Sequence, residues 1–328
     1  MAESATGMVS DLPPTPKRKN QNRRDWREAI KYELTGSRLR DTISAYLFLT
    51  PFLVFFAVFV LRSIIYSAYM SLHDWKILGT VQKLTKEPLG NYVELLNDDV
   101  WWLALKNSAV FAGLTVVGTT ALALSAAVIL QRKPTGSTFF RAVFYAPSIL
   151  SVGVVAIIWG WLLNTDFGTI NYLLQSIGLP KVNWTGDGNI VLITLSLVTI
   201  WWGFGFPMLI FLAGLQNIPE SLYESARIDG ASGWELFRYI TIPLLRPTLL
   251  FVTVTGFIAH FQVFGQPYFM TAKGGPGRSS YTAIIYLYQA AWEAYRMGFA
   301  AAVSFTLAGI LMAITLIQFL VAGRNDSN

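Results

Sequence analysis

The sequence contains no cysteine and only two histidines among its 328 residues. The absence of cysteine excludes disulfides, thiolate metal sites and cysteine nucleophiles. Charged residues are also scarce: they make up 13% of the chain, whereas a soluble domain carries about 25%. Because 53% of the residues are hydrophobic, the composition indicates a membrane protein before any motif is considered.

Long apolar stretches recur along the chain, separated by polar segments. A helix needs about 20 apolar residues to cross the hydrocarbon core of a bilayer. Stretches of this length cover residues 43–66, 104–130, 142–163, 190–212, 249–269 and 298–321. They predict an all-α integral membrane protein with six transmembrane helices.

Positive charge gathers on one predicted side of the membrane. Nine basic residues precede the first apolar stretch: Lys17, Arg18, Lys19, Arg23, Arg24, Arg27, Lys31, Arg38 and Arg40. The loop flanked by Arg132, Lys133 and Arg141 falls on the same side, and so does Arg324. By the positive-inside rule this side is the cytoplasm, and both termini are cytoplasmic. An RNA-binding tail is the alternative interpretation of the basic segment, but no aromatic stacking pattern accompanies it, so we expect no nucleic-acid partner.

These features divide the chain into three predicted parts. Residues 1–41 are a basic cytoplasmic segment, partly disordered, and residues 42–322 form the six-helix domain with a cytoplasmic loop at 215–247. Residues 323–328 are a short cytoplasmic tail. Within the first part, an apolar stripe could form an interfacial helix; its residues are Trp26, Ile30 and Leu34.

The loop at 215–247 is a polar, charged island between two apolar stretches. Residues 220–228 are good helix formers, and Gly230 can end that helix because glycine readily adopts the left-handed conformation. Ser232 can cap a second short helix, with Glu235 three residues later to complete a capping box. The island therefore predicts a helix, a tight turn and a helix.

The spacing inside this island resembles the EAA loop of the membrane subunits of bacterial ABC importers. The match runs from Glu224 through Gly230 to Pro243, with Ser225 in place of the second alanine and Ile242 in place of the usual leucine. The residues that the resemblance assigns to coupling with an ATPase are Glu224, Ser225, Ala226, Asp229, Gly230, Ala231 and Pro243.

The sequence around this loop is similar to the carbohydrate-uptake branch, the maltose-permease type. That resemblance implies a type I ABC importer permease fold in a bacterial or archaeal cytoplasmic membrane. It implies a second homologous permease subunit, two cytoplasmic ATPase subunits and an external sugar-binding protein as partners. No cofactor is expected on this chain, because it carries no nucleotide-binding signature; ATP and Mg²⁺ are expected on the partner ATPase.

The fourth apolar stretch contains the clearest candidate for a substrate path. Gly203-Phe204-Gly205 marks a broken helix, and transporters place ligands at such interruptions. By resemblance to the maltose-type permease, Trp201, Gly203 and Phe206 line the sugar site. Aromatic rings can stack on the C–H faces of a sugar, while its hydroxyl groups need polar partners. The alternative is that these aromatic residues only pack the bundle or face lipid.

Polar side chains in the fifth stretch complete the predicted path. Gln262 and Gln266 are four residues apart and are expected to share a helix face, whereas His260 is about 160° from Gln262 on a regular helix. Such groups are costly in a bilayer unless they face a cavity or a partner. The alternative role for all three is hydrogen bonding to a neighbouring helix.

We therefore expect a subunit that passes a di- or oligosaccharide, or a related polyol derivative, across the membrane. A glycerol-phosphate importer is an alternative, but it would need cations in the cavity; apart from Lys106 at the start of the second span, the predicted spans offer only His260 and Arg62. An ion-coupled secondary transporter would need a buried acid, and no span contains one. A membrane enzyme is a third alternative; the chain shows no convergent nucleophile and base, and we expect no catalytic residue and no metal site.

Overall fold

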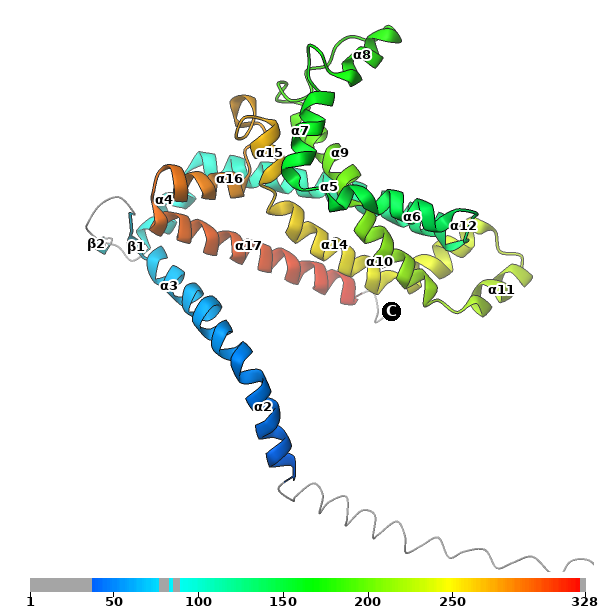
Figure 1. Ribbon diagram of the computed structural model, residues 1–328, viewed down its shortest axis with the longest axis horizontal. Helices are drawn as coiled ribbons and strands as arrows, with labels where there is room; N and C mark the ends of the chain where they lie inside the picture. The colour runs from blue at the N-terminus through cyan, green and yellow to red at the C-terminus, as the bar shows by residue number, and fades with distance from the viewer. Residues whose placement is uncertain (1–36, 77–82, 85–88, 325–328) are drawn as a thin grey trace, which may run out of the picture. The chain divides into compact units, whose positions relative to one another are not determined.

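The computed structural model describes residues 37–76, 83–84 and 89–324 (Figure 1). The predicted interfacial helix around Trp26 lies outside these residues. The chain divides into two compact units, residues 1–66 and 67–328, which are described separately.

The first unit is helical throughout its described part. It contains α2 (Ser37–Phe55), the π-helical turn η1 (Phe56–Leu61) and the start of α3 (Arg62–Ser71). All side chains from residue 42 to residue 66 are exposed, and most of them are apolar. A helix that is hydrophobic on every side suits a lipid environment, as predicted for the first span.

The second unit begins with two short strands and then is almost entirely helical. Its elements up to the middle of the chain are β1 (His73–Asp74), β2 (Lys83–Leu84), α4 (Gly90–Leu96), α5 (Asp99–Gln131), α6 (Ser137–Tyr145), η2 (Ala146–Ile149), α7 (Val152–Leu162) and α8 (Thr169–Ser176). The strands pair antiparallel, with His73 opposite Leu84.

The later elements follow the same pattern of long and broken helices. They are α9 (Val191–Gly203), α10 (Gly205–Gln216), α11 (Glu220–Ile228), α12 (Gly233–Leu236), η3 (Phe237–Thr241), α13 (Ile242–Leu244), α14 (Arg246–Phe261), α15 (Gly265–Met270), η4 (Pro276–Arg278), α16 (Ala283–Tyr288), η5 (Gln289–Glu293) and α17 (Met297–Arg324).

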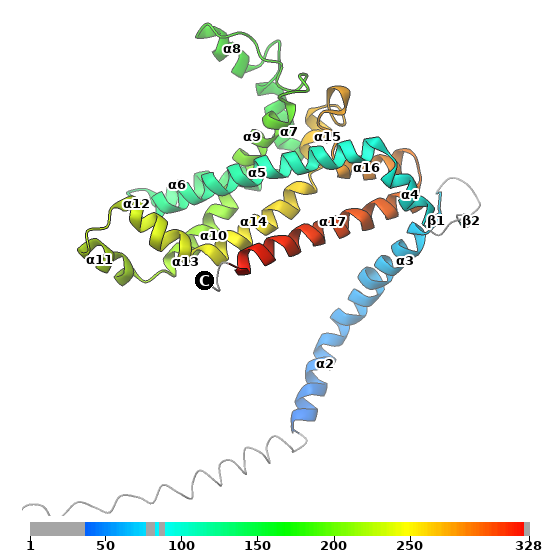
Figure 2. The ribbon, with the colours of Figure 1, turned by 180° about the vertical axis from the view of Figure 1, so that it is seen from behind.

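Helix α5 is the centre of the second unit, because it packs against α9, α10, α14 and α16. Figures 1 and 2 show α5, α14 and α17 lying side by side along the bundle. Small residues on α5 allow close packing: Ala123 and Ala127 are buried against Phe211 of α10. At Gly118 a Cβ atom would lie 2.3 Å from the terminal Cδ1 of Ile200, so a larger residue there would require the Ile200 side chain on α9 to shift.

The described residues contain helices for up to six membrane crossings, if each bent pair is counted as one span. Four segments are long and apolar enough to span by themselves: Thr42–Ser71, Asp99–Gln131, Arg246–Met270, which is interrupted at residues 262–264, and Met297–Val321. The other two are bent pairs, Ser137–Ile149 with Val152–Leu162 at 98° and Val191–Gly203 with Gly205–Gln216 at 52°. The prediction of an all-α membrane protein is confirmed, and the six predicted spans are accounted for when each bent pair counts as one; the third, fourth and fifth spans are broken rather than regular.

Three helix breaks come together inside the second unit. The first lies at Leu150–Ser151, where the Ser151 side chain accepts a hydrogen bond from the Val154 N–H and caps α7. The second lies at Phe204, between α9 and α10, and the third covers residues 262–264, between α14 and α15. Helix α15 packs directly on α7, and Ser148 before the first break is hydrogen bonded to Trp202 before the second. The sequence predicted only the break at Phe204.

Ion pairs and hydrogen bonds fasten the end of the bundle that carries α4. The Arg296 guanidinium, just before α17, donates two hydrogen bonds of 2.6 Å to the Glu94 carboxylate on α4. The Tyr286 hydroxyl on α16 donates to the Asp98 carboxylate at 2.6 Å. Hydrogen bonding to Arg296 holds the pKa of Glu94 below its usual value, and burial together with Asp98 raises the pKa of Tyr286. These contacts join α4, α5, α16 and α17 at one end.

Candidate functional site

The first candidate region is the coupling segment, which we define as residues 220–243. Helix α11 ends as predicted: Gly230 has a φ of +86°, in the left-handed region, and the Ala231 N–H donates to the Ala226 carbonyl at 2.9 Å. The predicted capping box on α12 is also present, since the Ser232 N–H donates to Glu235 Oε2 at 2.7 Å and the Glu235 N–H donates to Ser232 Oγ at 3.4 Å. The hydrogen bond that the carboxylate accepts from the Ser232 backbone N–H lowers the pKa of Glu235.

The residues of the EAA-like motif lie mostly on the surface of this segment. Glu224, Ser225, Asp229, Gly230 and Pro243 are exposed. The two alanines, Ala226 and Ala231, are half-buried. The Ser225 hydroxyl donates to the Ser221 carbonyl at 2.9 Å within the helix, which explains how serine can replace alanine at this position.

Large apolar side chains are also exposed on the coupling segment. Ile228 is 86% exposed and Trp234 is 66% exposed, and Leu222 and Tyr239 are exposed as well. Exposed apolar side chains grouped in this way mark a surface for a protein partner.

The second candidate region is a cavity of about 330 Å³ at the three helix breaks. Each broken span contributes to its wall: Ser148 precedes the first break, Gly203 precedes the second, and Val263 lies in the third. The complete lining is Ser148, Thr199, Trp202, Gly203, Phe206, Ala259, His260, Val263 and Gln266.

The structure brings four predicted substrate-path residues together in this cavity: Gly203, Phe206, His260 and Gln266. It does not place Trp201 there. Trp201 packs edge-on against Trp159, with 5.3 Å between ring centroids, and the neighbouring Trp202 lines the cavity instead. Two adjacent tryptophans on a helix face directions about 100° apart, and the sequence alone carries no signal for which of them faces inward.

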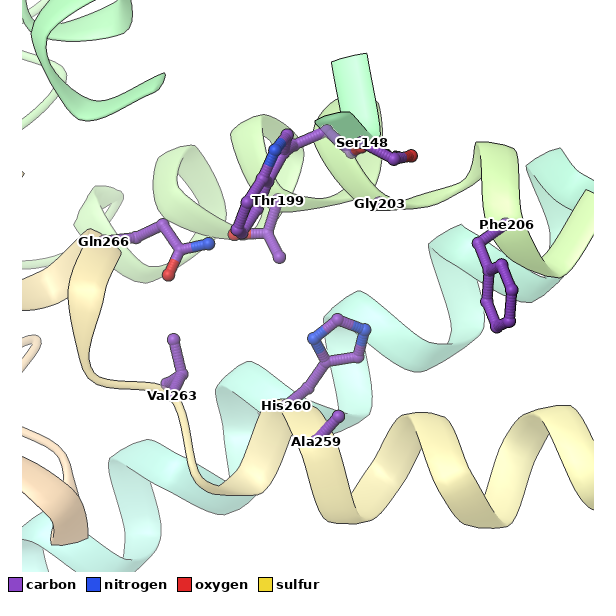
Figure 3. A pocket seen from close by; sticks show the side chains of 9 residues that line it. Ser148, Thr199, Gly203, Phe206, Ala259, His260, Val263 and Gln266 are labelled. Carbon is purple, nitrogen blue, oxygen red and sulfur yellow. Dashed lines mark hydrogen bonds between the residues drawn. The ribbon is translucent and has the colours of Figure 1, made fainter. Parts of the chain in front are cut away.

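The predicted arrangement of the fifth span is corrected in one respect. Gln262 and Gln266 do not share a face: Gln262 is exposed at the end of α14, whereas Gln266 is buried on α15. The prediction assumed a continuous helix, but the helix stops after Phe261 and restarts at Gly265. Figure 3 shows the consequence, with the His260 imidazole and the Gln266 amide both pointing into the cavity.

His260 and Gln266 are available for a ligand. Among the described residues, neither side chain has a hydrogen-bond partner, although only 4% of Gln266 is exposed. The two hydroxyl groups of the lining are already engaged, since Thr199 donates to the Leu195 carbonyl and Ser148 donates to the Trp202 carbonyl. An amide and an imidazole that face a cavity without a partner can bind hydroxyl groups as donors and acceptors.

The indole ring of Trp202 is held in place across the first break. Its Nε1–H donates to the Leu150 carbonyl at 3.1 Å, and its own carbonyl accepts the hydrogen bond from Ser148 at 3.1 Å. Ser148 and Trp202 were not among the predicted substrate-path residues. The break that orients them lies beside Pro147 and the capping Ser151, and these are the local signals that could have revealed it. The ring is thus a fixed apolar wall of the cavity.

The cavity favours a neutral, polar ligand with an apolar face. Its lining combines Trp202 and Phe206 with the amide and imidazole groups, and it includes no lysine, arginine, aspartate or glutamate. Within the part of the chain that the structure describes, no three His, Asp or Glu residues are grouped as metal ligands. The arrangement can bind a ligand, and none of the lining residues forms a nucleophile–base pair.

Comparison with protein families identifies a match over most of the second unit. The family described as "Binding-protein-dependent transport system inner membrane component" matches residues 118–326. That range includes both the coupling segment and the whole of the cavity lining.

Known proteins similar to the chain extend this match almost to its full length. The "Probable ABC transporter permease protein YurN" of Bacillus subtilis (strain 168) is 33% identical over 293 residues, covering 88% of this chain and 99% of the relative. The "Lactose transport system permease protein LacF" of Rhizobium radiobacter is 32% identical, covering 85% of this chain and 94% of the relative.

A solved structure shares the fold. A chain in the crystal structure of a bacterial alginate ABC transporter, in complex with an alginate pentasaccharide-bound periplasmic protein, superposes with a TM-score of 0.73 at 21% sequence identity. The match covers 86% of this chain and 95% of that chain.

Proposed function

Because the chain belongs to the family of binding-protein-dependent transport system inner membrane components and is a permease subunit of an ABC importer, we propose that it passes a di- or oligosaccharide through the cavity at its three helix breaks. The observation that carries this proposal is the cavity itself: His260 and Gln266 point into it without a hydrogen-bond partner among the described residues, and Trp202 belongs to the same lining. Each partner of a sugar is present: an apolar ring for its C–H face and polar groups for its hydroxyls.

The relatives support a carbohydrate as the substrate class. The name of one relative specifies lactose transport, and that protein covers 85% of this chain. The lining supports an uncharged substrate, since the cavity residues include no lysine or arginine to neutralise a phosphate. This favours a sugar over glycerol phosphate. A related polyol derivative would satisfy the same groups.

The chain works with partners that supply the energy and the substrate. We assign ATP and Mg²⁺ to a cytoplasmic ATPase that docks on the coupling segment, where Ile228 and Trp234 are exposed. An external sugar-binding protein delivers the substrate, and a second homologous permease completes the path, with two ATPase subunits in the complex. The assembly lies in the cytoplasmic membrane of a bacterium or archaeon.

Transport proceeds by alternating access in this proposal. ATP binding closes the ATPase dimer and moves the coupling segment, and the cavity changes from facing inward to facing outward. Glu224 and Asp229, both exposed, hold the segment on the ATPase, and the Gly230 turn sets the angle between α11 and α12. The sugar then leaves the binding protein for the cavity and reaches the cytoplasm when the ATPase reopens.

The test is the ATPase activity of the purified complex in lipid, with the external binding protein and a panel of sugars. We expect one sugar to stimulate hydrolysis and Trp202→Ala or Gln266→Leu to reduce import at least tenfold. Trp201→Ala is the matched control, because Trp201 packs on Trp159 outside the cavity. Stimulation by no sugar would overturn the substrate class, and loss of import in Trp201→Ala alone would overturn the assigned cavity.

A further inference from the structure

One hydrogen bond within the coupling segment connects α11 to the end of η3, just before the span that carries His260. The Tyr223 hydroxyl on α11 lies 3.0 Å from Thr241 Oγ1 at the end of η3. Thr241 is 4% exposed, and Tyr223 is half-buried. A polar contact at such a buried site is well shielded from water, so its loss has a measurable effect.

The direction of this bond follows from a second one. The Thr241 hydroxyl donates to the Leu236 carbonyl at 3.3 Å. A threonine hydroxyl has one proton, so Thr241 accepts at the other side and the Tyr223 hydroxyl donates to it. The result is a chain of two bonds from α11, through Thr241, to the backbone at the start of η3.

The two hydrogen bonds end on η3, which is a π-helical turn. In η3 the Ile242 N–H donates to the Phe237 carbonyl, one residue further back than in an α-helix. Single π turns are frequent at functional sites. Beyond η3 the chain continues through α13 into α14, whose last turn carries His260 at the cavity.

We propose that Tyr223 is a positioning residue: through its hydrogen bond to Thr241 it transmits the displacement of α11 to η3 and α14, and so to the cavity. This inference rests on the proposed function, in which a bound ATPase displaces α11. Helices α11 and α14 are also joined by the polypeptide backbone, but that connection runs through the Gly230 turn. The Tyr223 bond bypasses the turn.

The chain is suited to a direct test, because it contains no cysteine. Ala259 lines the cavity on the last turn of α14, so Ala259→Cys reports on movement there. The complex that co-purifies with its ATPase is labelled in lipid with a small methanethiosulfonate, with and without Mg-ATP and vanadate. The measured quantity is the ratio of the two labelling rates of the introduced thiol.

Removal of the tyrosine hydroxyl is expected to reduce that ratio. Tyr223→Phe keeps the ring and should lower the nucleotide-dependent ratio by about fivefold, the factor that corresponds to one net hydrogen bond. Thr241→Val should have a similar effect, the double variant should be no worse than the stronger single variant, and Thr241→Ser should retain the response. Tyr172→Phe is the matched control, since Tyr172 is 72% exposed on α8, outside the coupling segment, and its hydroxyl has no partner among the described residues.

The outcomes separate this inference from the proposed function. If labelling of the Ala259→Cys variant, with the chain otherwise unaltered, does not respond to nucleotide, the proposed function fails. If labelling responds to nucleotide and the ratio of the two labelling rates is the same after Tyr223→Phe is added, only the positioning role of Tyr223 is overturned. Additive effects of Tyr223→Phe and Thr241→Val would likewise show that the two hydroxyl groups act separately.

Discussion

Gly205 and Gly230 both follow the end of a helix, but they are needed for different physical reasons. A Cβ atom at Gly205 would lie 2.4 Å from the Phe144 carbonyl oxygen, so glycine there allows α10 to touch the backbone of α6. At Gly230 no atom lies within 4 Å of such a Cβ, and the requirement is the backbone φ of +86°. One glycine permits close packing, and the other permits a turn.

This difference gives a prediction for Gly230. Gly230→Val forces a branched side chain into the left-handed region, at a local cost of about 1–2 kcal/mol, without a steric clash. We expect the protein to insert and bind its partners normally but to show ATPase activity uncoupled from transport. Gly230→Asn should retain most coupling, because asparagine tolerates this conformation. Membrane yield and the ratio of sugar imported to ATP hydrolysed are the measurements; loss of insertion would mean that Gly230 is only structural.

At the residue scale, local signals predicted the coupling segment better than the cavity. The capping box of Ser232 and Glu235 and the left-handed Gly230 depend on neighbours within a few residues, and both were predicted. The inward position of Trp202 depends on the carbonyl of Leu150, 52 residues away in the chain. No pattern around Trp201 and Trp202 contains that information.

At the scale of the helices, the local sequence marks one break clearly and another poorly. The break at Phe204 is marked by flanking glycines, whereas the break after Phe261 has no glycine until Gly265. At this break Thr282 on a distant segment donates a hydrogen bond to the Val263 carbonyl. A hydrogen bond from a distant segment can therefore stabilise a helix break that the local sequence does not predict.

The Glu94–Arg296 pair predicts a pH dependence of stability at the α4 end of the bundle. The folded pKa of Glu94 is held below 4.5, its ordinary value, mainly by hydrogen bonding to Arg296. The stabilisation is therefore fully present above about pH 4.5 and is lost as the pH falls through the lower, folded pKa. Because the two side chains remain 50% and 33% exposed, the contribution is about 0.5–1 kcal/mol after solvent screening.

Thermal unfolding in detergent at pH 7 and pH 3.5 tests this expectation. Glu94→Gln should lower the midpoint at pH 7 and have less effect at pH 3.5, and salt should reduce the difference. Glu293→Gln is the control, since Glu293 accepts one hydrogen bond from Lys273 rather than two. Equal effects of both substitutions at both pH values would contradict the role assigned to the Arg296 pair.

For the whole molecule, the pattern of apolar stretches was sufficient to predict the number and order of the spans. Each predicted stretch corresponds to a continuous helix or a bent pair, because about 20 apolar residues must be covered in any membrane arrangement. The pattern could not predict how the spans pack, since the same apolar residues satisfy lipid and neighbouring helices equally well. Close contacts at Gly118 and Gly205 decide that packing.

The predicted orientation in the membrane is testable on the complete chain. Ile228→Cys and Tyr172→Cys place single thiols on exposed sites of α11 and α8, in a chain without other cysteines. A membrane-impermeant thiol reagent should label the Tyr172→Cys variant in intact cells and the Ile228→Cys variant in inside-out vesicles that hold the permease without its ATPase. The opposite pattern would reverse the orientation derived from the basic residues and would remove the coupling segment from the reach of a cytoplasmic ATPase.

The position of the cavity, where three helix breaks meet, affects how the substrate specificity of such a transporter can change during evolution. The lining residues nearest the breaks belong to different spans, whereas the exposed surface of α11 and α12 lies in a separate, contiguous segment. In the proposed function, substitution at Phe206 or Gln266 would therefore change which sugar is accepted without changing the exposed surface of α11 and α12. The residues that select the substrate and the residues that bind the ATPase would then be able to vary separately during evolution.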